Sequence, residues 1–259
     1  MPFLNRDNAQ IYYEVKGEGD AIVFAHGAGG NAAIWYNQVA AFHRAYTTIA
    51  FDHRLFGRSS CDEPLNVIHF RDDLVGMLDE LNIDRAHLVG QSMGGVTCLR
   101  TALDFPERVL SLTLSCTSGG IHNPEPSEAL RDLTSSSDRA TNGLLMTMSE
   151  ASAAKPELMQ LYESINNFNV KFSWDKLRTL LGPENVVQLS QLNQVSCPTL
   201  FISGVEDPLF PPDQLNQYVP YFHNADIKLV QDAGHSPYFE QPEIFNTLLR
   251  DHVEKVIVQ

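Results

Sequence analysis

The sequence has no cluster of basic residues and no long apolar run. Its 32 Asp and Glu outnumber its 18 Lys and Arg, so the formal net charge is −14. A nucleic-acid-binding surface needs a basic patch, and a membrane-spanning helix needs about 18 to 20 consecutive apolar residues. We therefore expect that the protein neither binds nucleic acid nor crosses a membrane.

Cysteine is sparse, and the usual cofactor motifs are absent. The four cysteines stand far apart, with no CxxC pair and no histidine at zinc-ligand spacing: Cys61, Cys98, Cys116 and Cys197. Neither the dinucleotide pattern GxGxxG nor a P-loop occurs. We expect buried free thiols, no metal and no cofactor. The N-terminal residues lack the basic and apolar segments of a signal peptide, which favours a cytoplasmic location.

The strongest motif is Gly90-Gln91-Ser92-Met93-Gly94, which lies between an apolar run and a helix-compatible segment. A sharp turn from strand to helix lifts such a serine clear of the sheet, at a helix N-terminus that favours negative charge. The flanking glycines let strand and helix approach each other closely. The pattern predicts a nucleophilic serine; the alternative is a glycine-rich turn with an ordinary serine.

Short apolar runs alternate with helical patterns along the chain. Strands are predicted at 11–15, 22–25, 47–51, 86–90, 109–114, 199–203 and 227–230, with helices at 70–81 and after Pro242. This alternation indicates an α/β fold, a mostly parallel sheet flanked by helices. We expect a core formed by 1–119 and 196–259 and an inserted helical cap at 120–195. Alternatively, the helices of 120–195 merely extend the core.

Three polar residues follow three of the predicted strands: Ser92, Asp207 and His235. The carboxyl ends of parallel strands meet at one edge of the sheet, so these side chains can converge. A serine hydroxyl needs a base to become a nucleophile, and a histidine base needs a carboxylate that fixes its tautomer. Taken singly, Asp207 could be a turn residue and His235 a loop residue, but the set predicts a catalytic triad.

Over essentially its whole length, the chain resembles the α/β-hydrolase family, in particular small bacterial carboxylesterases and enol-lactonases. The matching motifs are His26-Gly27, Gly90 to Gly95, Gly204-Val-Glu-Asp207-Pro and Gly234-His235. The resemblance implies that Ser92 is the nucleophile, His235 the general base and Asp207 its carboxylate partner, with Glu206 as the rival acid. It also implies an oxyanion hole formed by the N–H groups of Ala28 and Met93.

Two positions depart from relatives within that family. Leu55 stands where the family's loop after the third sheet strand usually has glycine, so Leu55 and Phe56 are expected near the pocket mouth. Gln91 stands where the C–C hydrolases of the family usually have asparagine, which argues against that branch without excluding it. Ser92 itself excludes the branches that use aspartate as the nucleophile.

These observations predict a serine hydrolase that cleaves a small, largely uncharged ester or lactone through an acyl-enzyme intermediate. The alternatives are a C–C hydrolase of the meta-cleavage type and a hydrolase-like receptor with slow turnover. Apolar and aromatic side chains are expected to contact the substrate: Trp35, Met146, Phe168, Phe172, Trp174, Phe210 and Tyr238.

Overall fold

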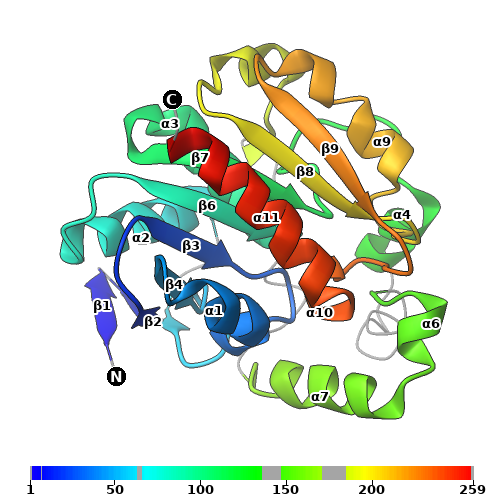
Figure 1. The fold of residues 1–259 in the computed structure, drawn as a ribbon, viewed down its shortest axis with the longest axis horizontal. Helices are drawn as coiled ribbons and strands as arrows, with labels where there is room; N and C mark the ends of the chain where they lie inside the picture. The colour runs from blue at the N-terminus through cyan, green and yellow to red at the C-terminus, as the bar shows by residue number, and fades with distance from the viewer. Residues whose placement is uncertain (1, 7, 63–65, 136–146, 171–184, 258–259) are drawn as a thin grey trace.

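The computed structural model describes residues 2–6, 8–62, 66–135, 147–170 and 185–257, and its described strands form one sheet (Figure 1). Across the sheet the order is β1 (Phe3–Arg6), β2 (Ala9–Lys16), β4 (Thr47–Phe51), β3 (Ala21–Ala25), β6 (Ala86–Gln91), β7 (Val109–Ser115), β8 (Thr199–Gly204) and β9 (Ala225–Val230). The short β5 (Ser60–Cys61) pairs with β2. Strands from β4 to β9 run parallel, and β2 is antiparallel to each of its neighbours.

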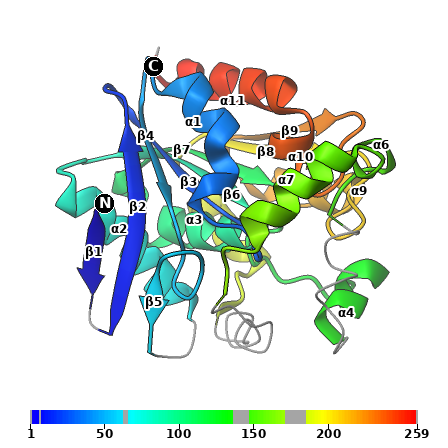
Figure 2. The same cartoon turned by 90° about the horizontal axis from the view of Figure 1, so that it is seen from below.

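Helices cover both faces of the sheet (Figure 2). One face carries α1 (Tyr36–Phe42) and α11 (Pro242–Ile257), and the other carries α2 (Val67–Glu80) and α3 (Met93–Asp104). In β3, Val23 and Ala25 belong to the apolar cluster under α2 and α3, whereas Ile22 and Phe24 belong to the cluster under α1 and α11. Successive side chains of a strand point to opposite faces, so a strand buried on both faces is a continuous apolar run. The predicted α/β class is confirmed.

Between β7 and β8 the described chain is mainly helical, with α4 (Glu128–Ser135), α6 (Glu150–Ala153), α7 (Pro156–Asn166) and η4 (Leu189–Gln194). Helices α6 and α7 lie beyond the carboxyl ends of the strands, next to α10 (Pro237–Glu240) (Figure 1). Near the two ends of the predicted cap, residues contact the core cluster under α3: Ile121, Val187 and Leu192. The cap bounds of 120–195 remain a prediction.

The remaining described elements are short. They are η1 (Ala32–Trp35), η2 (Pro106–Arg108), α9 (Pro212–Asn216) and η5 (Val219–Tyr221). Among the helices that the structure describes, none has both the length and the apolar character needed to cross a membrane. All four cysteines lie in described segments and form no disulfide, and all but the partly exposed Cys61 are buried.

Candidate active site

The turn at Ser92 joins β6 directly to α3. Ser92 has φ 50° and ψ −116°, a left-handed region that costs a non-glycine residue free energy and occurs most often at functional sites. Neighbouring groups hold this conformation: Ser92 N–H donates to Ser115 O at 3.0 Å, and Thr117 Oγ1 donates to Ser92 O at 2.7 Å. The strain is thus held in place by β7 and the residues that follow it.

Glycine is required on both sides of this turn. A Cβ atom on Gly90 would lie 2.5 Å from the carbonyl oxygen of Gly94, and one on Gly94 would lie 2.0 Å from that of Ala25. No side chain fits at either distance, so the glycines permit the close approach of strand and helix that the motif predicts.

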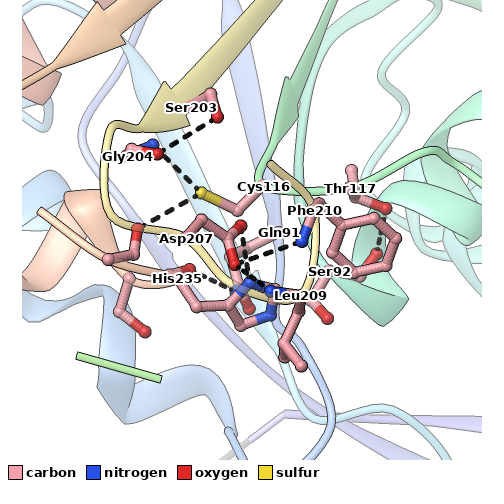
Figure 3. Close-up of polar contacts among 12 residues, drawn as sticks. Gln91, Ser92, Cys116, Thr117, Ser203, Gly204, Asp207, Leu209, Phe210 and His235 are labelled. Carbon is pink, nitrogen blue, oxygen red and sulfur yellow. Dashed lines mark hydrogen bonds and ion pairs between the residues drawn. The ribbon is translucent and has the colours of Figure 1, made fainter. Parts of the chain in front are cut away.

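The predicted acid and base meet at the ends of β8 and β9. Asp207 and His235 are both buried, and Asp207 Oδ2 lies 3.0 Å from His235 Nδ1 (Figure 3). The other carboxylate oxygen, Oδ1, accepts hydrogen bonds from the backbone N–H groups of Leu209 at 2.9 Å and Phe210 at 3.2 Å. A carboxylate fixed in this way accepts the Nδ1 proton and leaves Nε2 of His235 free to take a proton.

The rival acid, Glu206, has a different partner. It is exposed, and its Oε2 accepts a hydrogen bond from Glu150 N–H at the start of α6 at 3.0 Å. Asp207, and not Glu206, is the carboxylate that contacts His235.

The nucleophile turn contacts the histidine loop through Gln91. This buried side chain reaches from the end of β6 and donates from Nε2 to the carbonyl oxygen of His235 at 3.0 Å. Within the described residues the Ser92 hydroxyl makes no hydrogen bond to His235, and catalytic hydrogen bonds commonly tighten only in the substrate complex. Gln91 therefore links the nucleophile turn to the loop that carries His235. The sequence distinguished Gln91 from its counterpart in C–C hydrolases but gave no signal for this contact.

The two expected oxyanion donors lie close to the serine. Met93 is the first residue of α3, so its N–H has no acceptor within the helix. Ala28 follows Gly27, where a Cβ atom would lie 3.0 Å from Ser92 Cβ. Ala28 also packs against the apolar cluster that contains Met93. Both N–H groups therefore belong to segments in contact with the Ser92 turn.

A buried histidine braces the Ala28 loop. His26 Nδ1 lies 2.7 Å from Gly27 O, and its Nε2 accepts a hydrogen bond from His53 N–H at 2.9 Å. Complete burial lowers the pKa of His26 to about 4, so the ring is neutral near pH 7 and donates through Nδ1. Its contacts are those of a structural brace.

Leu55 and Phe56 pack below the oxyanion donors. Leu55 has φ 68°, and both side chains are buried in a cluster with Met93 and Val96. They were expected near the pocket mouth, but an exposure of 5% and 0% shows that they form the packed layer beneath Met93 instead.

Comparisons with known proteins identify the family of this chain. The sequence profile described as alpha/beta hydrolase fold matches residues 20–141. A 2-hydroxy-6-oxononadienedioate/2-hydroxy-6-oxononatrienedioate hydrolase of Paraburkholderia phymatum is 31% identical over 266 residues, covering 93% of this chain and 90% of the relative. The solved structure of Est816, an N-acyl homoserine lactone degrading enzyme, is 30% identical with a TM-score of 0.84, covering 96% of this chain and 99% of that one. The chain belongs to the α/β-hydrolase superfamily.

A further relative of this hydrolase has a similar name and a similar coverage. The 2-hydroxy-6-oxo-6-phenylhexa-2,4-dienoate hydrolase of Burkholderia cepacia is 29% identical over 265 residues, covering 94% of this chain and 91% of the relative. Relatives named as hydrolases of 2-hydroxy-6-oxo acids thus match more than nine-tenths of this hydrolase.

Two of the aromatic residues expected at the substrate pocket of the hydrolase are buried in a core cluster. Trp35 is fully buried, with its ring centroid 4.5 Å from Tyr238 and 5.2 Å from Phe24. Tyr238 is only 2% exposed and also packs against Phe245. An aromatic residue near a catalytic loop can support the loop by packing or can contact the substrate. The sequence does not distinguish these two roles.

The other expected pocket residues differ in position. Phe210 is partly buried, and its ring stacks on His235 at 5.7 Å with an interplanar angle of 19°. Phe168 lies just after α7 and is 60% exposed. Met146, Phe172 and Trp174 lie outside the described residues.

One cysteine lies beside the acid and base. Cys116, with φ 48°, accepts a hydrogen bond from Gly204 N–H at Sγ and donates to Gly234 O. In the described part of the chain, Cys116, Asp207 and His235 are grouped closely enough to hold a metal ion, with their ligand atoms within 4.8 Å of one another. Burial raises the pKa of Cys116 well above its ordinary value, whereas a metal needs the thiolate. The contacts of Cys116 fit a residue that packs the loops together.

Proposed function

We propose that this hydrolase cleaves a small, uncharged carboxylic ester or lactone through an acyl-serine intermediate. The observation that carries the proposal is the 3.0 Å contact between the buried Asp207 carboxylate and His235 Nδ1, beside a serine held in a strained turn. This arrangement has one chemical use that needs all three groups, which is activation of the serine hydroxyl for attack on a carbonyl carbon.

Each step follows from a named contact. Because Asp207 accepts the Nδ1 proton of His235, Nε2 takes the proton of Ser92 Oγ as that oxygen bonds to the carbonyl carbon. The negative charge that develops on the carbonyl oxygen is stabilised by the N–H groups of Ala28 and Met93 and by the N-terminus of α3. His235 then returns the proton to the leaving alkoxide, which stays attached to the acyl group when the substrate is a lactone. Water repeats the sequence to release the acid.

The charges beside the site support an uncharged substrate. In the loop after β4, Arg54 is tied to Asp73 by two hydrogen bonds of 2.7 and 2.8 Å, and Arg58 pairs with Asp52 and Glu14. These guanidinium groups are already neutralised by carboxylates. The cluster that contains Met93 and contacts Ala28 is apolar, which suits a substrate with one polar reacting group.

A second candidate is hydrolysis of a C–C bond beside a ketone. It is favoured by the match at 31% identity, over 93% of this chain, to a relative named as a hydrolase of 2-hydroxy-6-oxo acids, which carry such a ketone. That relative's name describes a dioate, whose two carboxylates would need cationic partners that the described neighbours of the site do not offer. The ester or lactone reaction therefore ranks first.

A substrate panel with Ser92→Ala tests the proposal. The panel contains p-nitrophenyl esters of increasing acyl length, simple and N-acyl homoserine lactones, and 2-hydroxy-6-oxo-6-phenylhexa-2,4-dienoate. We expect steady turnover of an ester or lactone, and a loss of about 10⁶ in kcat with Ser92→Ala. Ser164→Ala, on the exposed face of α7, is the matched control.

Three outcomes would contradict the proposal. Turnover of an ester by Ser92→Ala at the wild-type rate would exclude Ser92 as the nucleophile. Turnover of the dienoate alone would establish the C–C reaction. A single burst of acylation without steady turnover would point to the receptor alternative.

A further inference from the structure

The backbone on both sides of His235 is fully hydrogen-bonded. His235 N–H donates to Thr147 O at 2.7 Å, and its carbonyl oxygen accepts from Gln91 at 3.0 Å. The N–H groups of Gly234 and Ser236, the residues directly before and after, both donate to Oε1 of Glu240, at 2.9 and 3.0 Å. One carboxylate oxygen therefore clamps the peptide groups that flank the catalytic base.

The second oxygen of Glu240 reaches the segment before α6. Oε2 accepts a hydrogen bond from Ser149 N–H at 2.7 Å. The two segments also touch through their backbones, because a Cβ atom on Gly234 would lie 2.7 Å from Ser149 N. Ser149 Oγ adds a hydrogen bond to Asp232 O at 3.1 Å. Glu240 thus joins the histidine loop to residues 147–149.

A carboxylate in this position is costly. Glu240 is 5% exposed, and no lysine, arginine or histidine in the described residues forms an ion pair with it. Burying a carboxylate costs several kcal/mol unless hydrogen bonds compensate, and here the three main-chain N–H groups provide them. An apolar side chain would pack at lower cost, but it would leave three buried N–H groups without an acceptor.

We propose that Glu240 is a positioning residue that sets the place of His235 relative to Ser92 and ties the histidine loop to residues 147–149. This inference rests on the proposed function, since His235 acts there as the base. Glu240 touches neither substrate nor the reacting atoms. It acts through the peptide groups of Gly234 and Ser236.

The expected effect is on the rate of the chemical step. Without the carboxylate, the N–H groups of Ser149, Gly234 and Ser236 lose their acceptor and the imidazole is free to move. A displacement of about 1 Å costs on the order of 10²-fold in rate, whereas substrate binding does not depend on the histidine. Loss of Glu240 should therefore lower kcat and leave KM nearly unchanged.

Glu240→Gln is the main test. The amide keeps the shape of the side chain but offers one acceptor oxygen, and its NH₂ group faces a donor N–H. We expect kcat to fall by about 10- to 100-fold at unchanged KM, at a temperature where melting curves show the variant folded. Glu243→Gln makes the same chemical change on an exposed carboxylate at the start of α11 and should match wild type.

Glu240→Ala adds a rescue experiment. The atoms removed beyond Cβ correspond to acetate, so added acetate should restore part of kcat, whereas acetamide should not. The low-field proton resonance of His235 Nδ1–H should shift or broaden in both Glu240 variants and stay in place in Glu243→Gln.

Hydrogen exchange on the unmodified protein tests the same inference without a variant. The amides of Ser149, Gly234 and Ser236 share one acceptor group and should exchange with one common opening rate. Independent exchange of the three, a wild-type kcat in Glu240→Gln, or a loss that only follows the unfolded fraction would each overturn the inference. If the wild type turns over no substrate, the proposed function fails. The amide exchange rates and the His235 Nδ1–H resonance still test whether Glu240 positions the histidine loop.

Discussion

Replacing Asp207 by asparagine tests the triad most sharply, because the surrounding hydrogen bonds dictate how the amide must lie. Oδ1 of Asp207 faces two donors, the N–H groups of Leu209 and Phe210. An NH₂ group in that place would oppose both of them, so the amide oxygen must occupy it. The NH₂ group then takes the place of Oδ2, which lies 3.0 Å from His235 Nδ1.

This orientation forces the wrong tautomer of His235. An NH₂ group can only donate, so Nδ1 must accept and the ring proton moves to Nε2. A protonated Nε2 cannot take the proton of Ser92. We expect Asp207→Asn to lower kcat by about 10⁴, equivalent to about 5.4 kcal/mol of transition-state stabilisation, with little change in KM.

The assay is steady-state hydrolysis of the best ester or lactone, with melting curves to verify folding. Glu206→Gln is the matched control, because the neighbouring carboxylate contacts Glu150 N–H and not His235. It should keep kcat within about twofold, the ordinary range of an exposed substitution. A folded Asp207→Asn with near wild-type kcat, or a crippled Glu206→Gln, would refute the assignment of the acid.

Two further predictions concern stability. Burial lowers the pKa of His26, His87 and His252 from 6.5 to about 4, so between these values the unfolded chain binds more protons than the folded one. The free energy of unfolding should therefore fall by about 4 kcal/mol for each unit of decreasing pH near pH 5. Urea titrations that give the same free energy of unfolding at pH 7 and pH 5 would disprove this. In the buried Arg54–Asp73 pair, Asp73→Ala should cost about 3 to 5 kcal/mol by leaving the guanidinium unpaired, and Arg54→Met with Asp73→Leu should recover most of it; a cost below about 1 kcal/mol for the single change would contradict the prediction.

The sequence predicts the parts of this fold that depend on local pattern. The central strands are buried on both faces, so they appear as unbroken apolar runs. The nucleophile turn is predictable because a steric requirement between neighbouring residues is met only by glycine, as at Gly90 and Gly94. By contrast, β1 is an edge strand with three exposed residues of four, and its sequence carries no such signal.

Contacts between distant segments could not be predicted in the same way. Gln91 and His235 are 144 residues apart, and Ser149 and Glu240 are 91 apart. A glutamine before a serine and a glutamate at the end of a short helix are ordinary surface residues in the sequence. Only the folded arrangement shows that each is buried and that each bonds the histidine loop or its neighbours.

Leu55 stands where the family usually has glycine, and the sequence shows this difference. The structural consequence of the difference could not be predicted from the sequence. Leu55 takes the left-handed conformation that glycine adopts freely, with φ 68°, so the leucine bears a strain on the order of 1 kcal/mol. Burial of the side chain against Met93 and Val96 offsets this, since a buried leucine contributes about 2 kcal/mol. The bulky side chain therefore supports the start of α3, whose first N–H is an expected oxyanion donor.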